Sequence, residues 1–109
     1  MYVSVTGLRL KSLKHVATFW RHAIPSFRQA QTAPGNLFCE TKRRGKFQHT
    51  LTVWQDRKAM KAYVASGPHL KAMAVFGAIA DGKTFGWEAE TIPDWAEALA
   101  RWDAEAKDV

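Results

Sequence analysis

A chain of 109 residues, 47% of them hydrophobic, is long enough to bury its own core, so we expect one domain over residues 1–109. The formal net charge of +6 does not form a stripe. Its densest run, residues 42–46, predicts a turn, which argues against nucleic-acid binding. The chain shows no signal-peptide pattern, no apolar run near the roughly 18 residues of a membrane span and no second cysteine, so we expect a cytoplasmic protein without an internal disulfide.

The first 36 residues predict a strand followed by a long helix. In residues 2–8 valines alternate with Tyr, Ser and Thr, which is typical of a strand with two different faces. Ser12 suits the cap of a helix that begins at Leu13, and Pro25 predicts a kink between Arg21 and Pro25. Residues 32–36, TAPGN, end this helix. Its apolar stripe consists of Leu13, Val16, Trp20, Ile24 and Phe27.

A hairpin follows the first helix. Residues 37–42 predict a second strand, and residues 46–54 predict a third after a turn at Arg43–Gly45. Because side chains alternate along a strand, the third strand has two faces. One face carries Phe47, His49, Leu51 and Val53, and the other carries Gln48, Thr50, Thr52 and Trp54. Cys39 lacks an activating pattern and is predicted to be a small core residue.

The second half predicts two helices, a strand and a last helix. Asp56 caps a helix over residues 57–66, and Gly67 with Pro68 separates it from a helix over residues 68–80. A turn at residues 81–83 leads to a strand at residues 84–90, and Pro93 opens a helix over residues 94–106. The order βαββαβ with an extra C-terminal helix predicts an α+β, ferredoxin-like antiparallel sheet with helices on one face.

The other sheet face lacks a cover in this scheme. Thr50, Thr52 and Trp54 lie there, and their neighbours are too weakly charged for a fully wet surface. Such a face usually finds a partner, and two sheets packed face to face make a dimer. We therefore expect a homodimer.

Two segments resemble a known group of proteins. Residues 49–73, HTLTVWQDRKAMKAYVASGPHLKAM, resemble the strand-to-helix signature of dimeric α+β barrel proteins, including antibiotic biosynthesis monooxygenase-like domains. The Asp56 cap and the SGPH break at residues 66–69 occur there together. Residues 84–102, TFGWEAETIPDWAEALARW, resemble the tail of a bacterial subgroup related to spheroidene monooxygenase-like proteins.

The resemblance implies a pocket between the sheet and the helices. Within that implied pocket, His49 and His69 are the candidate catalytic residues, because a histidine can act as a base or donate a hydrogen bond near neutral pH. The alternative for each is a packing role with its nitrogens satisfied by neighbours. The candidate substrate-binding residues are Trp20, His22, Phe47, Leu51, Tyr63 and Trp87, with Phe85 as an alternative to Trp87.

The resemblance and the residue spacing bear on cofactors and partners. Haem-degrading members of the superfamily have an axial histidine where this chain has Met73, which disfavours haem. The four histidines lack metal-ligand spacing, so we expect no metal and no tightly held cofactor. RNA-recognition modules share this strand order, but Ser4, Lys46 and Gln48 stand where their stacking rings belong, so we expect no nucleic-acid partner.

Two functions remain open on this sequence. The first is a cofactor-independent monooxygenase-like protein that binds or oxidises an apolar or aromatic small molecule in the sheet–helix pocket. The alternative is a non-catalytic small-molecule-binding or interaction domain on the same dimeric scaffold. Fold resemblance carries the first reading, and a fold alone does not determine chemistry.

Overall fold

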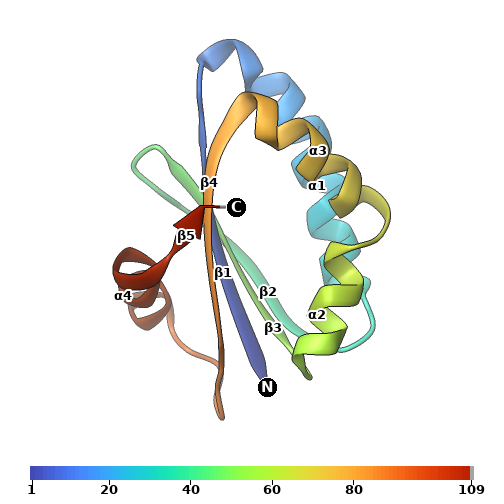
Figure 1. Cartoon of the computed structure of the whole chain (residues 1–109), viewed down its shortest axis with the longest axis vertical. Helices are drawn as coiled ribbons and strands as arrows, with labels where there is room; N and C mark the ends of the chain where they lie inside the picture. The colour runs from blue at the N-terminus through green and yellow to red at the C-terminus, as the bar shows by residue number, and fades with distance from the viewer. Residues whose placement is uncertain (109) are drawn as a thin grey trace.

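The computed structural model describes residues 1–108 and has an α+β, ferredoxin-like fold. Ten elements follow one another along the chain, and the five strands form one antiparallel sheet (Figure 1). They are β1 (Tyr2–Leu10), η1 (Leu13–His15), α1 (Val16–Thr32), β2 (Asn36–Arg44), β3 (Phe47–Trp54), α2 (Arg57–Val64), α3 (Gly67–Ile79), β4 (Ala80–Glu88), α4 (Trp95–Glu105) and β5 (Lys107–Asp108).

The strand order is β2-β3-β1-β4-β5, which places β1 at the centre. In β1, Val5 pairs with Leu51 of β3 on one side and with Phe85 of β4 on the other. Side chains alternate along each strand, so odd-numbered residues of β1, β3 and β4 share one sheet face and even-numbered residues share the other. This register decides which residues meet which helices.

Helices cover both faces of the sheet. Figure 1 shows α1, α2 and α3 together on one side of the sheet and α4 alone on the other. The prediction of helices on one face only is therefore wrong, because the C-terminal helix packs back on the second face. The face of Thr50, Thr52 and Trp54, predicted to lie uncovered, faces α1–α3, and Trp54 is fully buried. The homodimer was expected because this face was predicted to be uncovered, so that argument no longer applies.

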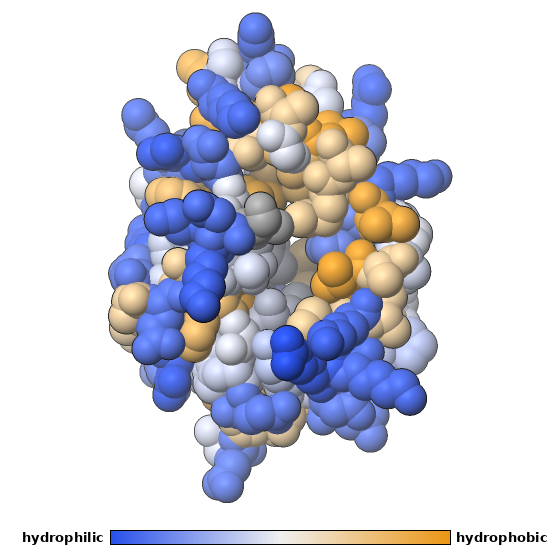
Figure 2. Space-filling view, viewed as in Figure 1, coloured by the Kyte–Doolittle hydropathy of each residue, from blue (hydrophilic) through white to orange (hydrophobic). Residues whose placement is uncertain are grey.

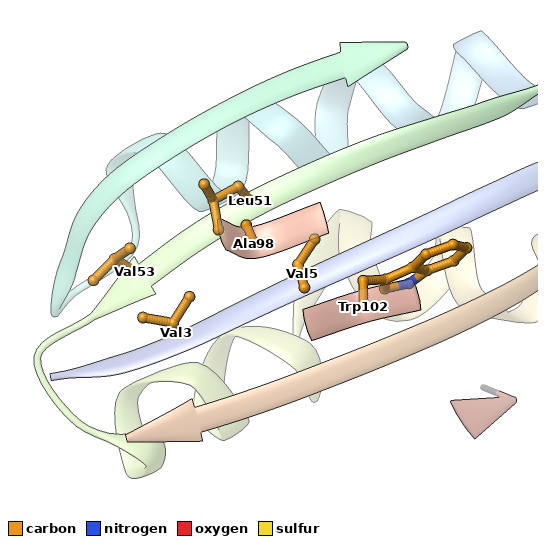
Figure 3. Close-up of a cluster of buried hydrophobic side chains, with 6 residues drawn as sticks. All are labelled: Val3, Val5, Leu51, Val53, Ala98 and Trp102. Atoms are coloured by element: carbon orange, nitrogen blue, oxygen red, sulfur yellow. The ribbon is translucent and has the colours of Figure 1, made fainter. Parts of the chain in front are cut away.

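The face under α4 is packed like a core. Val3, Val5, Leu51 and Val53 are fully buried there (Figure 3). Ala98 and Trp102 of α4 lie over these four side chains, and Asp94 caps the helix by accepting from the Glu97 N–H. Trp95 packs against the same cluster, as its seven-residue spacing from Trp102 predicts.

A second core joins α1 to α3. Phe19 stacks on Phe76 with ring centroids 5.1 Å apart, and Ala72 and Ile79 are buried beside them. α1 continues through Pro25, which lies inside the helix. The two cores lie on opposite sides of the sheet, and the space beside the second one is the subject of the next section.

Several predicted boundaries shift. The expected turn at residues 81–83 is wrong, because β4 begins at Ala80 and Asp81 pairs with Arg9 of β1. The break between α2 and α3 is confirmed, with Gly67 at a φ of +55°, a conformation that favours glycine. The two-residue strand β5 pairs with Lys83 and Thr84 and was not predicted.

Among residues 1–108, no helix combines the length and the apolar character that crossing a membrane requires.

Candidate functional site

A cavity of about 590 Å³ lies between the sheet and the three helices α1, α2 and α3. It is within the size range of small-molecule sites. Figure 2 shows a hollow in this view of the molecule, with apolar side chains gathered over the helices beside it. The cavity has a floor from the sheet and a roof from the helices, and the two differ in chemistry.

Hydroxyl groups dominate the floor. The side chains come from the even-numbered positions of β1, β3 and β4, which point toward α1–α3. Thr6 and Thr84 lie with their hydroxyl oxygens 3.1 Å apart, and Thr84 also donates to the Val5 carbonyl at 3.3 Å. The floor residues are Tyr2, Ser4, Thr6, Leu8, Gln48, Thr50, Thr52, Thr84 and Gly86, with Thr41 of β2 at the edge.

Apolar side chains dominate the roof. Trp20 and Ile24 of α1 line the cavity and are 42% and 46% exposed, so they border its opening. Met60 and Val64 of α2 and Met73 of α3 contribute further apolar surface. An apolar roof over a hydroxyl floor suits a ligand with a large apolar body and a few oxygen atoms.

His69 stands at the start of α3 and lines this cavity. Its Nδ1 lies 3.2 Å from the Val64 carbonyl, and only a donor makes a hydrogen bond with a carbonyl. Nδ1 therefore carries the proton, and Nε2 is left as an acceptor. Burial lowers the pKa of His69, which favours this neutral ring at neutral pH.

Tyr63 of α2 lies between two other rings. Its ring centroid is 4.6 Å from that of His69 and 5.0 Å from that of Trp54. The hydroxyl donates to the Ser26 carbonyl at 3.1 Å, and burial raises the pKa of Tyr63 to about 12. The Tyr63 hydroxyl is therefore protonated and uncharged at neutral pH, and its ring packs against the ring of His69.

The cavity lining carries little charge. Arg28 is its one formally charged side chain within residues 1–108, and neither Asp nor Glu contributes to it. A ligand that becomes anionic inside this cavity meets no carboxylate repulsion from the lining. The neutral His69, the floor hydroxyls and the Arg28 cation are among the polar groups that the lining offers to its oxygen atoms.

His49 lies on the opposite sheet face, under α4. It is fully buried, and its ring meets Trp102 edge-to-face at 4.7 Å and Phe47 at 5.8 Å. Neither ring nitrogen has a hydrogen-bond partner within residues 1–108. Burial and the nearby Arg44 cation lower the pKa of His49; the Thr6 backbone opposes this shift without reaching hydrogen-bonding geometry.

Gly7 makes the His49 packing possible. A Cβ at this position would lie 2.5 Å from Cζ2 of Trp102 and 2.8 Å from Cε1 of His49. The two rings therefore occupy the space directly above β1. Arg44 extends this cluster, because its guanidinium lies 5.6 Å from the Trp102 ring and binds the Asp103 carboxylate through two hydrogen bonds.

The structure thus separates the predicted site residues. Trp20, Tyr63 and His69 line the cavity together. The prediction that the Phe47, His49, Leu51 and Val53 side of β3 faces the pocket is wrong, because that side faces α4. The predicted residues on the α4 side are His49, Phe47, Leu51 and Trp87, with Phe85. His22 is half-buried and lies outside the cavity lining.

The hydroxyl floor was missed, although the sequence carries a signal for it. Ser4 and Thr6 in β1, Thr50 and Thr52 in β3, and Thr84 in β4 share one parity. Of these five, Thr50 and Thr52 were interpreted, with Trp54, as an uncovered outer face. The signal is a repeated hydroxyl at every second position of strands that pair with each other.

Two other chemistries find little support. Burial, with the neighbouring Glu40 carboxylate, raises the pKa of the Cys39 thiol to about 12, so this half-buried cysteine is a poor nucleophile. Among the described residues 1–108, no three His, Cys, Asp or Glu side chains form a group that could hold a metal ion.

Comparison with known proteins supports the fold and leaves the reaction open. The sequence matches no protein-family model and no curated protein. SnoaB from Streptomyces nogalater, described as a cofactor-independent oxygenase, has a similar structure with a TM-score of 0.67 and 16% identity, covering 85% of this chain and 97% of SnoaB. Rv0793 from Mycobacterium tuberculosis has a TM-score of 0.74 and 10% identity, covering 86% and 100%.

A further similar structure is described as an antibiotic biosynthesis monooxygenase, with a TM-score of 0.73 and 12% identity, covering 84% of this chain and 100% of its own. The chain therefore has the fold of antibiotic biosynthesis monooxygenase-like α+β proteins. At these identities the likeness concerns the fold, and the relation to the spheroidene monooxygenase-like subgroup stays a prediction.

Proposed function

We propose that this protein is a cofactor-independent monooxygenase that oxidises an apolar aromatic small molecule in the cavity between the sheet and α1–α3. The observation that carries this proposal is the contrast between the hydroxyl floor and the apolar roof, with His69 in the same lining and its Nδ1 bonded to the Val64 carbonyl. The description of SnoaB, which shares the fold, as a cofactor-independent oxygenase supports the reaction class. The lone, unreactive Cys39 is compatible with the cytoplasmic location that we also propose.

The proposed chemistry uses His69 as a base. The substrate carries an acidic C–H group that is bonded to two of its own aromatic rings. This group loses its proton to Nε2 of His69, and the floor hydroxyls stabilise the resulting enolate oxygen. Dioxygen is the oxidant of this electron-rich anion. In the overall reaction a CH₂ group and O₂ give a C=O group and one water, so one oxygen atom enters the product and the other leaves as water.

The test uses anthrone as the probe, because its CH₂ lies between two aromatic rings and its oxidation product is anthraquinone. Oxygen uptake and product absorbance are followed with a chelator present. We expect turnover above the buffer rate and a loss of roughly 10²-fold or more in His69→Ala. His22→Ala is the matched control, because His22 lies outside the cavity lining.

One result would favour the alternative function, and another would contradict the role given to His69. Rates equal to buffer for anthrone and for a panel of naphthols, together with micromolar binding of those probes, indicate the non-catalytic binding domain. Equal losses of turnover in His22→Ala and His69→Ala contradict the assignment of His69 as the base.

The proposal includes a homodimer as a separate point. Both sheet faces are covered within one chain, so a partner would contact the apolar side chains that remain exposed on the helical side, such as Leu13 at 87% and Leu70 at 55%. Sedimentation velocity at micromolar concentration tests this point. A single species with the mass of one chain contradicts the homodimer and leaves the cavity chemistry unaffected.

A further inference from the structure

Gln29 of α1 binds the junction between α2 and α3 with both ends of its amide. Its Nε2 donates to the Ser66 carbonyl at 2.9 Å and lies 3.2 Å from the Ser66 hydroxyl. Its Oε1 accepts from the backbone N–H of His69 at 2.8 Å. The orientation of the amide is fixed, because a backbone N–H only donates and a carbonyl only accepts.

The junction lacks a cap of its own. α3 begins after Ser66, whose side chain makes no capping bond to α3 and instead donates back to the Ala62 carbonyl of α2 at 3.0 Å. The first N–H groups of a helix have no partner inside the helix. Gln29 supplies the missing acceptor for His69 from a different helix, 40 residues earlier in the chain.

Gly67 lies against the Gln29 amide, and its backbone conformation makes the turn possible. This glycine has a φ of +55°, and a Cβ there would lie 3.4 Å from the Gln29 amide atoms. The chain therefore turns between α2 and α3 directly against the Gln29 side chain. A residue that bonds both sides of this turn fixes the angle at which α3 begins.

His69 depends on this junction twice. Its backbone N–H is held by Gln29, and its ring Nδ1 donates to the carbonyl of Val64, the last residue of α2. The far end of α3 is held separately by the stacking of Phe76 on Phe19. Loss of the Gln29 bonds would thus loosen the end of α3 that carries His69 and leave the other end packed.

We propose that Gln29 is a positioning residue that holds the His69 ring with its proton on Nδ1 and its Nε2 open to the cavity. The catalytic meaning of this role rests on the proposed function, whereas the effect on the His69 ring does not. Gln29 acts only through His69, because the group that takes the proton in the proposed reaction is Nε2 of His69.

The experiment records ¹⁵N chemical shifts of the imidazole rings in the wild-type protein and in Gln29→Met, which keeps the length of the side chain and removes its hydrogen bonds. We expect the His69 shifts to report protonated Nδ1 in the wild type and a mixture of both tautomers in Gln29→Met. The pKa of His69 should move back toward its ordinary value, while the signals of His15 and His22 stay unchanged. On anthrone, kcat should fall roughly tenfold to a hundredfold with a smaller change in KM.

Two further variants keep the test decisive. Thr32→Ala is the matched control, because the Thr32 hydroxyl bonds only carbonyls of its own helix. Gln29→Glu keeps an acceptor for His69 but opposes an oxygen to the Ser66 carbonyl, so it should shift the tautomer even if Gln29→Met folds poorly.

The outcomes separate this inference from the proposed function. Wild-type tautomer and pKa of His69 in both Gln29 variants overturn the positioning role, whether or not anthrone is oxidised. A shifted tautomer in the Gln29 variants supports the positioning role even if the wild-type protein turns over none of the probes, and that absence of wild-type turnover counts against the monooxygenase.

Discussion

His49 and His69 lie on opposite faces of one sheet, the first fully buried and the second half-buried. His49 is enclosed by Phe47, Trp102 and the bare backbone of Gly7, and neither of its nitrogens has a hydrogen-bond partner in the described part of the chain. His69 has one nitrogen bound to a carbonyl and lies at the wall of a cavity. Burial lowers the pKa of both rings. The same shift therefore accompanies a filled core on one face and an open site on the other.

This difference teaches that position relative to empty space, more than protonation, distinguishes a candidate base from a packing residue. The α4 side stabilises the fold through close contacts, and the α1–α3 side leaves about 590 Å³ unfilled. Substitutions on the first side should change stability, and substitutions on the second should change ligand binding or turnover. The following predictions test this division.

The largest effect should follow Trp102→Ala. Trp102 is 6% exposed, covers Val5 and His49, and donates from Nε1 to the Lys83 carbonyl at 3.0 Å. Loss of such a ring costs about 3–5 kcal/mol of unfolding free energy, which urea denaturation measures. The matched variant Trp20→Ala should cost roughly 1 kcal/mol and weaken binding of an aromatic probe. Similar stability losses in the two variants would contradict the division.

Gly7→Ala should have the next largest effect. The new methyl group would overlap Trp102 and His49, and overpacking of this kind costs about 1–3 kcal/mol. Gly77→Ala in α3 is the control, because a Cβ there meets no atom within 4 Å. That control should be neutral or stabilising, since glycine inside a helix is less stable than alanine. Thermal unfolding of both variants compares them directly, and an equal Tm would show that the space above Gly7 can relax.

Substitutions in the cavity floor should change the free energy of unfolding by less, and only where the threonine hydroxyl makes hydrogen bonds within the protein. Thr84→Val removes two hydrogen bonds, to Thr6 and to the Val5 carbonyl, and should cost about 1 kcal/mol in urea denaturation. Thr50→Val is the partner variant, because the Thr50 hydroxyl makes no side-chain hydrogen bond within residues 1–108. It should leave stability unchanged and weaken binding of an oxygen-bearing probe. A stability loss at Thr50 equal to that at Thr84 would count against this division.

The pH dependence of stability should reveal His49. Its pKa in the folded protein lies below its ordinary value of 6.5, so the unfolded chain takes up a proton first as the pH falls. The free energy of unfolding should be full above pH 6.5 and fall as the pH drops toward the folded-state pKa. His49→Leu should flatten this profile between pH 8 and 5, measured by urea denaturation.

Two neighbours of His49 set the limits of that experiment. Arg44 is positive throughout, and its hydrogen bonds lower the pKa of Asp103, which therefore titrates at more acidic pH than the range used. His69 shares the direction of the shift, so His49→Leu should remove only part of the slope. An unchanged profile in His49→Leu would show that His49 is protonated equally easily in both states.

Local patterns predicted most of the elements but not the sides of the sheet. Asp56 and Gly67 mark helix ends through chemistry that acts within a few residues, and both lie at helix ends in the structure. The last helix was predicted from Pro93, and its cap is Asp94. The alternation in β3 separated its two faces correctly. The alternation alone does not determine which face packs against α1–α3, because either face could pack against those helices or against α4.

The site was misplaced for this reason. An apolar face with His49 in its middle was interpreted as a pocket wall, since apolar side chains commonly line pockets. In the structure the amphipathic helix α4 packs on that face, and the threonine face borders the cavity. The roles of Gln29 and Gly7 depend on contacts with residues 37 or more positions away, which no local pattern records.

The strand order has a consequence for solubility. β5 pairs with β4 at Lys83 and Thr84, which blocks part of one sheet edge, and β2 forms the other edge along nine residues. An unpaired edge strand is a template for strand addition by another chain, and charged side chains on it oppose that addition. Lys42 and Arg43 are exposed on β2. The start of the basic run, which the sequence predicted to be only a turn, therefore places cations on an open sheet edge, where they oppose edge-to-edge aggregation.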